Sequence, residues 1–415
     1  MSYTMSSEWV SPGHPDRVAD VIAASLIQRI QQKDGANSHS AIEVMLANDL
    51  CIIGGEATTS LDLNEEAPKA VSEALKAIGY DEKYREKFTK DECYVDGDYK
   101  IEVHVNRQSP DIAQGVGRDK GFNDQGVFCS SAEVWGHNKM GLAQEIATTI
   151  GDRMMKNAKD HPWFGIDIKT LVSVRYNDNH TPNCIEAITL AIPTISGVTR
   201  DEYQPYLESF VDQILTGQYK NYYNGPATVK ITINGTGDYH IHGSLGDTGL
   251  TGRKLAVNCN SLYSPIGGGS LVKPAHASDL LLFLAARHIS KAVVESGKAK
   301  FCEVQLSCAI GQKKLQSFRL MLDHQDIDTA LSLEIQRIAE RYFDWSPAGF
   351  DRLWNMYQLP FMQTAITNFI GSDNYAAQPW ENTTELRRLL ADILPGYENA
   401  VPIEESKEDN NSGQN

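Results

Sequence analysis

The chain has no apolar run long enough to cross a bilayer. Its most apolar stretch, residues 280–286, is far shorter than the roughly 20 residues that a membrane-spanning helix needs. The opening segment, MSYTMSSEWV, has no basic region followed by an apolar core, so we expect no secretory signal. These two absences favour a cytoplasmic protein over a membrane-bound or exported one.

Paired cysteines and positive charge are also scarce. The seven cysteines are scattered and no CxxC pair occurs, so neither a zinc site nor a disulfide framework is indicated. The formal net charge is −16 at pH 7. An acidic chain is a poor partner for nucleic acid or for an anionic membrane surface, so we expect neither as a partner.

Several familiar catalytic motifs are missing. The chain has no G-x-x-x-x-G-K followed by Ser or Thr, and no GxSxG nucleophile elbow. Gly115, Gly117 and Gly121 miss the spacing of the dinucleotide-binding fingerprint by one residue, and no βαβ unit surrounds them. The common phosphate-loop, hydrolase and Rossmann classes are therefore excluded.

What remains is an ordinary globular composition in which no alternating strand–helix series of the parallel type runs through the chain. The 415 residues suffice for two or three domains. Hairpin signals followed by single amphipathic helices recur, for example the strands 41–47 and 50–53 before the helix 64–79. This order predicts an α+β fold with helices on one sheet face. The polar, charged residues 404–415 are typical of a disordered tail.

The most informative stretch is residues 246–269, GDTGLTGRKLAVNCNSLYSPIGGG. Arg253 and Lys254 bring adjacent positive charges among glycines that let backbone N–H groups approach an anion closely. Lys273 follows just beyond the triple glycine. The pattern suits a polyphosphate, although a glycine-rich hairpin with solvated cations fits it equally well.

Further charged residues lie at element ends. His14 and Asp16 flank Pro15 at a predicted helix N-terminus, where anions are favoured but where an Asp can also serve only as a cap. Asp167 and Lys169 are two residues apart and share one face of an extended chain, so they form either part of a site or a surface ion pair.

A long segment without apolar periodicity, residues 108–126, has the polar and glycine-rich character of an active-site lid. Glu43 lies in a predicted strand, and Glu56 follows Gly54 and Gly55 directly after another. Either glutamate is also compatible with a solvated strand residue.

Taken together, these motifs resemble the S-adenosylmethionine synthetase (methionine adenosyltransferase) family. The resemblance runs from Glu8 to about Trp380. Its pieces, in the family's order, are Gly13-His14-Pro15-Asp16, Gly54-Gly55-Glu56, Gln108-Ser-Pro-Asp111-Ile, Asp124-Gln125-Gly126, Gly246-Asp247 with Gly249-Leu-Thr-Gly-Arg253-Lys254, the triple glycine, and Ala309-Ile310-Gly311.

The resemblance implies that methionine sulfur attacks C5′ of ATP and expels the tripolyphosphate, which is then hydrolysed to phosphate and diphosphate. It also implies three similar α+β domains with pseudo-threefold symmetry, mixed or antiparallel sheets, and sheets packed at a dimer interface. We expect a homodimer or a dimer of dimers with active sites between subunits. The implied segments are 3–107 (N-terminal), 120–240 (central) and 241–400 (C-terminal), with a lid at 108–120.

The resemblance also assigns roles to residues. The cofactors would be Mg²⁺, two per site, and K⁺. The residues divide by role: His14, Lys169, Arg253, Lys254 and Lys273 on the triphosphate; Asp16 and Asp279 on Mg²⁺; Glu43 on K⁺; Glu56, Gln108 and Asp247 on methionine; Tyr239 and Ile310 around the adenine; and Asp124, Asp167, Asp247 and Ser270 also at ATP.

The chain departs from the family pattern after the triple glycine. The segment is one residue shorter, and Ala277 stands where the family has a second lysine of the methionine site. Phe122-Asn123 replaces Ala-Gly, and Cys308 stands where a tyrosine is usual. Either His276 or a neighbouring cation compensates, or the methionine pocket has changed. Two alternatives stay open: a paralogue with altered S-alkyl homocysteine specificity, and a catalytically silent regulatory subunit.

Overall fold

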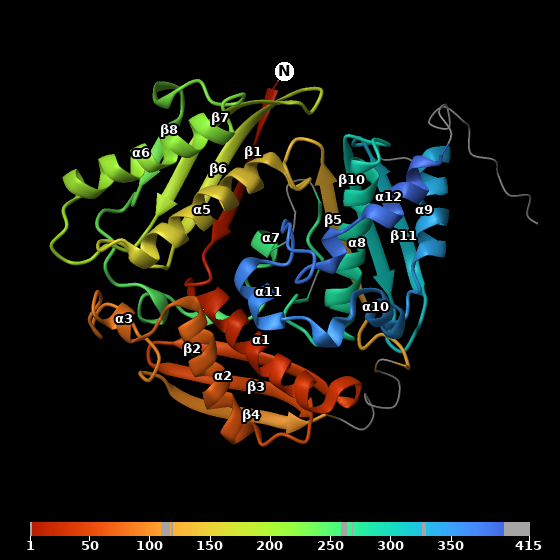
Figure 1. Ribbon diagram of the computed structural model, residues 1–415, viewed down its shortest axis with the longest axis horizontal. Helices are drawn as coiled ribbons and strands as arrows, with labels where there is room; N and C mark the ends of the chain where they lie inside the picture. The colour runs from red at the N-terminus through yellow and green to blue at the C-terminus, as the bar shows by residue number, and fades with distance from the viewer. Residues whose placement is uncertain are drawn as a thin grey trace, which may run out of the picture.

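Three β-sheets, each with helices packed on one face, lie on three sides of the molecule (Figure 1). The computed structural model describes residues 2–108, 117, 119–258, 264–267, 269–325 and 329–393, with only the backbone of residue 258. The α+β architecture expected from the sequence is confirmed. Most of the expected lid, Gly268 of the triple glycine and the expected tail lie outside the described residues.

The first sheet has the strand order β4-β3-β2-β9. Its strands are β2 (His39–Ala47), β3 (Leu50–Thr58), β4 (Lys100–Arg107) and β9 (Gly249–Leu250). The accompanying helices are α1 (Pro15–Asp34), α2 (Leu63–Ile78), α3 (Glu82–Arg85) and the short η1 (Gly35–Asn37). The hairpin turn after β2 falls at Asn48, whose positive φ of 52° suits asparagine, as the Asn48-Asp49 signal predicted.

The second sheet has the order β1-β6-β7-β8. Its strands are β1 (Ser2–Val10), β6 (Lys169–Asn177), β7 (Pro182–Ala191) and β8 (Lys230–Ile233). Its helices are α5 (Leu142–Asp160) and α6 (Arg200–Gln218), followed by η2 (Pro226–Thr228) and η3 (Gly243–Leu245).

The third sheet has the order β11-β10-β5. Its strands are β5 (Gly126–Glu133), β10 (Phe301–Cys308) and β11 (Leu315–Leu322). The helices of this part are α7 (Leu255–Asn258), α8 (Ser278–Glu295), α9 (Ala330–Tyr342), α10 (Pro347–Trp354), η4 (Met356–Gln358), α11 (Phe361–Thr367), η5 (Pro379–Glu381) and α12 (Thr384–Ala391).

Strands are exchanged between the three sheets in a cycle. β1 precedes the strands of the first sheet in sequence but pairs with β6 of the second sheet. β5 precedes the other strands of the second sheet's segment but pairs with β10 of the third sheet. β9 follows the strands of the second sheet in sequence but pairs with β2 of the first sheet. Each sheet therefore combines strands from two of the three segments expected as domains. The exchange brings the start of α1 beside β9.

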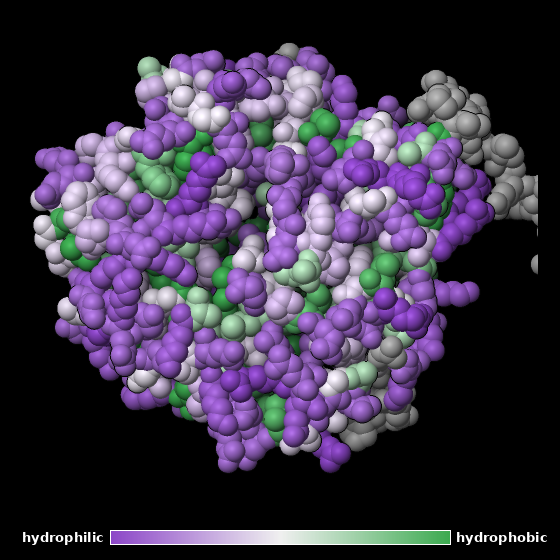
Figure 2. All heavy atoms as spheres, viewed as in Figure 1, coloured by the Kyte–Doolittle hydropathy of each residue, from purple (hydrophilic) through white to green (hydrophobic). Residues whose placement is uncertain are grey.

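The core is continuous, and α1 lies in it with almost every residue of its first three turns buried. Figure 2 shows that the viewed face is mostly hydrophilic, with hydrophobic residues gathered around a hollow near its centre. Among the described residues, no helix combines the length and apolar character needed to cross a membrane. The cysteines in the described part of the chain are free thiols.

One expectation about Glu56 is wrong. β3 continues to Thr58, so Glu56 lies within the strand opposite Ala41 rather than after it. Gly55 makes this possible: its φ is +122°, and a Cβ there would lie 1.9 Å from the carbonyl oxygen of Ala41. The glycine therefore serves close packing of two strands, which is a structural role.

Candidate active site

The first charged group is organised by Asp16, which is fully buried at the start of α1. Its Oδ1 accepts a hydrogen bond from the Leu250 backbone N–H at 2.9 Å, and the Lys254 Nζ lies 2.6 Å from Oδ2. A Cβ on Gly249 would meet the Pro15 carbonyl oxygen at 2.2 Å, so only glycine lets the two segments approach this closely. Asp16 thus does more than cap its own helix: it holds the 249–254 turn.

Arg253 and Lys254 both face Asp16, but neither cation is enclosed. The Arg253 Nε lies 3.5 Å from the Asp16 Oδ1, and 48% of the arginine side chain is exposed. One helical turn after Asp16, the buried Asp20 accepts a hydrogen bond from the Gly252 N–H at 2.9 Å. Sequence reasoning missed Asp20, although its i, i+4 spacing from Asp16 places both on one helix face.

His14 sits beneath this group as a neutral hydrogen-bond donor. Burial, then Lys169, Lys254, Arg17 and Arg253, lower the pKa of His14 to about 2. Its Nδ1 accepts from the Asp16 N–H at 3.1 Å, so the ring proton is assigned to Nε2. That Nε2 is buried and has no partner among the described residues. A donor surrounded by cations and without an acceptor is suited to an anion.

Asp167 forms the neighbouring wall of the same group. It is buried, and its Oδ2 accepts from the Tyr239 hydroxyl at 2.9 Å and from the Gly243 N–H at 3.0 Å. Burial raises the pKa of Asp167 to about 6, and the nearby Asp247 contributes in the same direction. Lys169 is exposed and does not pair with Asp167, so the surface ion pair considered from the sequence is not formed.

The second charged group surrounds a cavity of about 410 Å³. The Lys273 Nζ lies 2.6 Å from the Glu43 Oε1, and the Thr251 hydroxyl donates to Glu43 as well. Burial, with Asp124 and Glu43 nearby, raises the pKa of Asp279 to about 6. The lining residues are Glu43, Asp124, Gln125, Gly126, Thr251, Gly252, Gly269, Ser270, Lys273 and Asp279. Because Thr251 and Gly252 belong to the turn held by Asp16 and Asp20, this turn connects the two groups.

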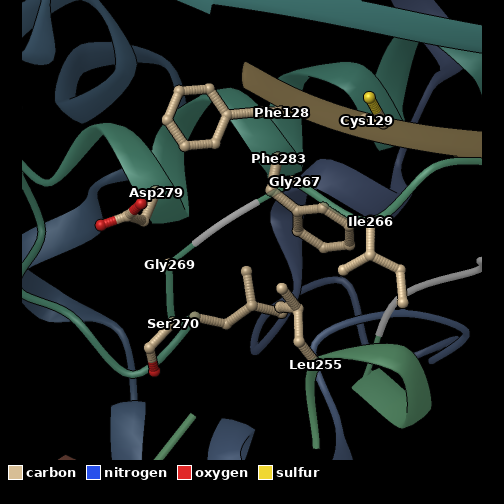
Figure 3. Close-up of a pocket in the computed structure, with 10 residues that line it drawn as sticks. Phe128, Cys129, Leu255, Ile266, Gly267, Gly269, Ser270, Asp279 and Phe283 are labelled. Carbon is tan, nitrogen blue, oxygen red and sulfur yellow. The ribbon is translucent and has the colours of Figure 1, made fainter. Parts of the chain in front are cut away.

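The glycine cluster closes one side of that cavity. Gly269 has φ +94°, and a Cβ there would come within 2.0 Å of the Asp279 Oδ1. Figure 3 shows Asp279 and Ser270 beside an apolar pocket into which Phe128 and Phe283 project. Gly269 therefore allows the backbone to pass directly beside the Asp279 carboxylate, while the approach of backbone N–H groups to a bound anion stays a prediction.

Three of the expected site residues are not joined to either group. Glu56 lies opposite Ala41, on the face of β3 that alternates with the buried Cys51, Ile53 and Ala57. Gln108 ends the described part of its segment, and Ile310 is 46% exposed after β10. Within the described ranges, none of the three forms a hydrogen bond or ion pair with the residues around Asp16 or Glu43.

The residues around Ala277 show whether another cation replaces the missing lysine. Ala277 is fully buried before α8, and burial lowers the pKa of His276 to about 3. The His276 ring lies 4.9 Å from the ring of His39, with the Tyr357 hydroxyl 3.4 Å from its Nδ1. His276 is therefore a neutral interior residue and does not replace the lysine as a cation. Asn123 instead caps α8, accepting from the Ser278 N–H at 2.8 Å.

The carboxylates in these groups offer oxygen ligands of the kind that hard cations prefer. Among the described residues, no three His, Cys, Asp or Glu side chains lie together closely enough to hold a metal ion by themselves. Asp16 and Asp279 each present one carboxylate beside cations. Any metal bound there needs further oxygens from phosphate and water, which fits the expected donor set.

Comparisons with known proteins agree with this architecture. Family models for S-adenosylmethionine synthetase match its N-terminal domain over residues 2–110, its central domain over 119–239 and its C-terminal domain over 241–382. An S-adenosylmethionine synthase of Acholeplasma laidlawii is 36% identical over 383 residues, covering 89% of this chain and 95% of that one. S-adenosylmethionine synthase 1 of Rhodopseudomonas palustris is 30% identical over 394 residues, covering 94% and 98%.

A solved structure, described as an unusual S-adenosylmethionine synthetase from Campylobacter jejuni, superposes with a TM-score of 0.83 at 29% identity. It covers 94% of this chain and 100% of the other. The chain belongs to the S-adenosylmethionine synthetase family. It is a transferase of the methionine adenosyltransferase class, and enzymes of this family depend on metal ions.

Proposed function

We propose that the two charged groups hold ATP by its phosphates and metals during S-adenosylmethionine synthesis. The reaction joins the sulfur of L-methionine to C5′ of ATP and releases the tripolyphosphate, which is hydrolysed to phosphate and diphosphate. A thioether sulfur is a neutral nucleophile with no proton to lose, so no general base is needed. The demand falls on the leaving group, which gains negative charge as the C–O bond breaks.

The residues around Asp16 meet that demand. Lys169, Arg253 and Lys254 bring fixed positive charge, and the neutral His14 presents a proton on Nε2. Lys273 adds a cation beside the cavity of the second group. Donors that are already in place stabilise developing charge without reorganisation at the moment of reaction. The single observation that carries the proposal is the buried Nε2 of His14, which lies among four cations and has no hydrogen-bond partner in the described part of the chain.

Asp16 and Asp279 would hold Mg²⁺, two ions per site, with phosphate oxygens completing the coordination. Glu43 would hold K⁺. Its half-exposed carboxylate accepts hydrogen bonds from the Lys273 ammonium group and the Thr251 hydroxyl. When bound, the divalent ions would neutralise charge on the departing phosphates. The chain's own part is to fix these carboxylates beside cations and to keep Asp16 bonded to the 249–254 turn.

We further propose that two copies of the chain complete each site. Glu56 and Gln108, with Asp247, would contact methionine; Tyr239 and Ile310 would enclose the adenine; Asp124, Asp167 and Ser270 would lie at the nucleotide. Glu56 is half-buried, Ile310 is exposed, and within the described residues neither is connected to the Asp16 group, which is expected if they serve a partner's site. The assembly would be a homodimer or a dimer of dimers in the cytoplasm, with domains at 3–107, 120–240 and 241–400.

An altered S-alkyl homocysteine specificity is a second candidate, favoured by one cluster of departures from the family pattern. Asn123 caps α8 at Ser278, next to Ala277, and the Cys308 thiol lies 3.3 Å from the Asp124 carbonyl oxygen. These changed residues therefore meet around one segment, and the neutral His276 supplies no replacement charge. A methionine pocket without this lysine should discriminate less strongly between S-methyl and longer S-alkyl groups.

Mass spectrometry of the product from ATP and methionine, with the purified chain alone, tests the proposal. We expect S-adenosylmethionine, with phosphate and diphosphate formed in equal amounts and only when methionine and Mg²⁺ are present. Phosphate release without methionine dependence would contradict it. Turnover by the purified chain alone also rules out a silent regulatory subunit. Parallel assays with ethionine decide the second candidate, since an unchanged strong preference for methionine removes its basis.

A further inference from the structure

A second cavity, of about 450 Å³, lies outside the charged groups described above. It is formed by the end of α2, by α3 and the residues after it, and by the last turns of α5. Its volume is within the range of small-molecule sites. The chain's proposed catalysis uses none of the charged side chains that line it.

The lining of this cavity is basic in a chain that is strongly acidic. Five lysines and two aspartates line it, a difference of three positive charges, whereas the whole chain carries −16. The lysines are Lys76, Lys83, Lys87, Lys156 and Lys159. Electrostatic focusing in a cleft lined by one sign of charge raises the local concentration of oppositely charged ligands.

Both aspartates are already engaged. The Asp81 Oδ1 accepts from the Tyr84 N–H at 3.0 Å as the cap of α3, and the Asp160 Oδ1 lies 3.4 Å from the Lys83 Nζ. Helix ends account for part of the lysine set, since Lys87 donates to carbonyls at the end of α5. They do not account for Lys156, a turn before that end, which forms no ion pair with another described residue.

We propose that this cavity binds a polyphosphate group, either inorganic or carried by a nucleotide. Three of the five lysines already have partners: Lys76 pairs with Asp96 at 3.1 Å, Lys83 pairs with Asp160 at 3.4 Å, and Lys87 donates to carbonyls at the end of α5. Lys156 and Lys159, both on α5, form no ion pair with another described residue and provide the charges that meet the ligand. Two neighbouring ammonium groups suit a ligand with negative charges on neighbouring oxygens better than a single carboxylate.

The cavity shares a wall with the proposed ATP site. Tyr84 and Ile166 line it. On the other side, the Tyr84 hydroxyl lies 2.5 Å from the Nε2 of the buried His242 and accepts from the Ile166 N–H at 3.1 Å. Ile166 directly precedes Asp167, and its carbonyl oxygen would lie only 2.3 Å from a Cβ on Gly13. An anion that shifts this wall shifts Asp167 and the segment before His14, so we infer that occupancy changes ATP use. This effect, unlike the binding itself, rests on the proposed function.

Calorimetric titration with inorganic tripolyphosphate tests the binding. The double variant Lys156→Glu, Lys159→Glu is compared with wild type and with the matched control Lys220→Glu, Lys230→Glu, which changes the same charge at exposed lysines elsewhere. We expect two classes of site in wild type and in the control, and one class weakened at least tenfold in the cavity variant. Two intact classes in the cavity variant, or equal weakening in the control, would overturn the proposal.

Two further arms separate the sources and the sites. Titration with GTP shows whether the cavity binds a nucleotide. If the cavity variant loses affinity for both tripolyphosphate and GTP, the cavity recognises the phosphates. If it loses affinity for only one of them, that ligand is the one that the cavity binds. Lys254→Met should weaken the other class. If it does not, the proposed ATP placement fails while the cavity site stands.

The effect on synthesis is measured as inhibition by tripolyphosphate over a range of ATP concentrations. We expect a component that added ATP does not relieve in wild type and in the control, and its absence in the cavity variant. Identical inhibition patterns in all three proteins would show that the cavity does not act on the active site.

Discussion

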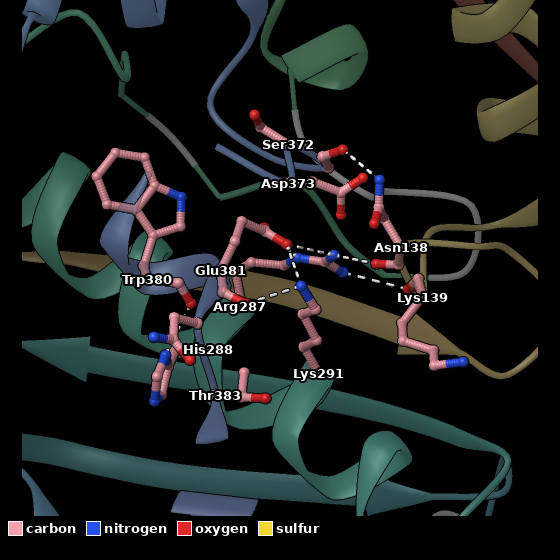
Figure 4. Close-up of polar contacts among 12 residues, drawn as sticks. Asn138, Lys139, Arg287, His288, Lys291, Ser372, Asp373, Trp380, Glu381 and Thr383 are labelled. Atoms are coloured by element: carbon pink, nitrogen blue, oxygen red, sulfur yellow. Dashed lines mark hydrogen bonds and ion pairs between the residues drawn. The ribbon is translucent and has the colours of Figure 1, made fainter. Parts of the chain in front are cut away.

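The Asp16 group and a second cluster around Glu381 are each built on one buried carboxylate that contacts an arginine and a lysine. Around Glu381 the cluster is closed (Figure 4): Arg287 and Lys291 lie at 2.8 Å from its carboxylate oxygens and are buried with it. Arg287 also donates to backbone carbonyls of Ser131, Asn138 and Lys139. Around Asp16 the cluster is open, because Arg253 is half exposed and no described residue bonds to the Nε2 of His14.

The difference lies in where the charges find their partners. The Glu381 cluster satisfies every ion within the protein, and Arg287 and Lys291 hold the pKa of Glu381 at about 2 even though burial opposes them. In the Asp16 group the cations are not enclosed in this way, because Lys169 is exposed and 48% of the Arg253 side chain is exposed. A closed cluster fixes α8 against the segment of η5, whereas an open one leaves charge available for a ligand. Similar side chains thus serve structure in one place and binding in the other.

The largest effect should come from breaking the closed cluster. Glu381→Gln leaves the buried Arg287 without a counter-charge and leaves Lys291 with only the Glu295 carboxylate at 4.0 Å, so we expect a loss of about 3–5 kcal/mol in the free energy of unfolding. Urea denaturation measures it, and the folded fraction should keep its turnover number within twofold. Because the folded pKa of Glu381 lies below its unfolded value, its contribution to stability is present above about pH 4 and is lost as the pH falls towards 2. A variant as stable as wild type would contradict the comparison.

Removing a cation from the open Asp16 group should lower activity more than stability. Lys254→Met removes a cation at the proposed phosphate site, so we expect kcat to fall by about 10²–10³. The thermal midpoint should fall by less than in Glu381→Gln, because Arg253 and the Leu250 N–H still contact the buried Asp16. Product formation by mass spectrometry measures the effect, with Lys220→Met as the exposed-lysine control. A kcat within tenfold of wild type would remove Lys254 from the phosphate site.

The pH dependence separates ligand binding from stability. The pKa of Asp167 is raised to about 6, so kcat/KM for ATP should fall as the pH drops through 6, by about tenfold per unit below it. Stability should move the other way, since a raised folded pKa makes the free energy of unfolding decrease as the pH rises from about 4 to 6. Profiles of kcat/KM against pH check the first expectation, and urea midpoints check the second. Both are measured over roughly pH 4.5–8, a range that brackets the pKa of Asp167. Parallel loss of rate and stability on acidification would contradict the assignment.

Tyr239→Phe sharpens that assignment with a smaller change. The Tyr239 hydroxyl donates to the Asp167 carboxylate, and this bond favours the charged form. Its removal should raise the pKa of Asp167 and move the acid limb of kcat/KM upward by about one pH unit, equivalent to about 1.4 kcal/mol. A reduced rate with an unmoved limb would mean that the hydroxyl acts on packing alone.

The smallest catalytic effect is expected at His276. Because this residue is neutral and packed between His39 and Tyr357, His276→Asn should leave the KM for methionine within about threefold of wild type, as expected for a residue that touches no substrate. Steady-state kinetics with methionine check it. A tenfold rise in KM would restore His276 as a substitute for the missing lysine.

The sequence predicted the α+β fold, which the structure confirms, whereas the roles of the site residues stay predictions. Short-range signatures of a helix N-terminus and of a glycine-rich turn marked two separate candidates, His14 with Asp16 and Arg253 with Lys254. Only the family resemblance placed them in one site, and the structure brings the two segments together around Asp16. β1 was read as a short opening segment, because its residues alternate between exposed and half-buried and carry little apolar contrast. The cyclic exchange of strands depends on pairings between distant residues, for which the sequence has no local signal.

Long-range charge partners were missed for the same reason. Glu381 lies 94 residues from Arg287 and 90 from Lys291, so nothing in the spacing links them. The wall formed by Tyr84 and His242 joins residues 158 apart. Asp20 is different: its spacing from Asp16 was readable, but an acidic residue inside a helix gives no hint of the turn that it binds.

The most direct test of the central claim is a crystal structure of the chain with methionine, Mg²⁺ and an ATP analogue whose phosphate chain resists hydrolysis. The account predicts that the phosphate oxygens contact Lys169, Lys254 and Lys273, with the His14 Nε2 donating to one of them. Phosphates directed away from these four residues would contradict it.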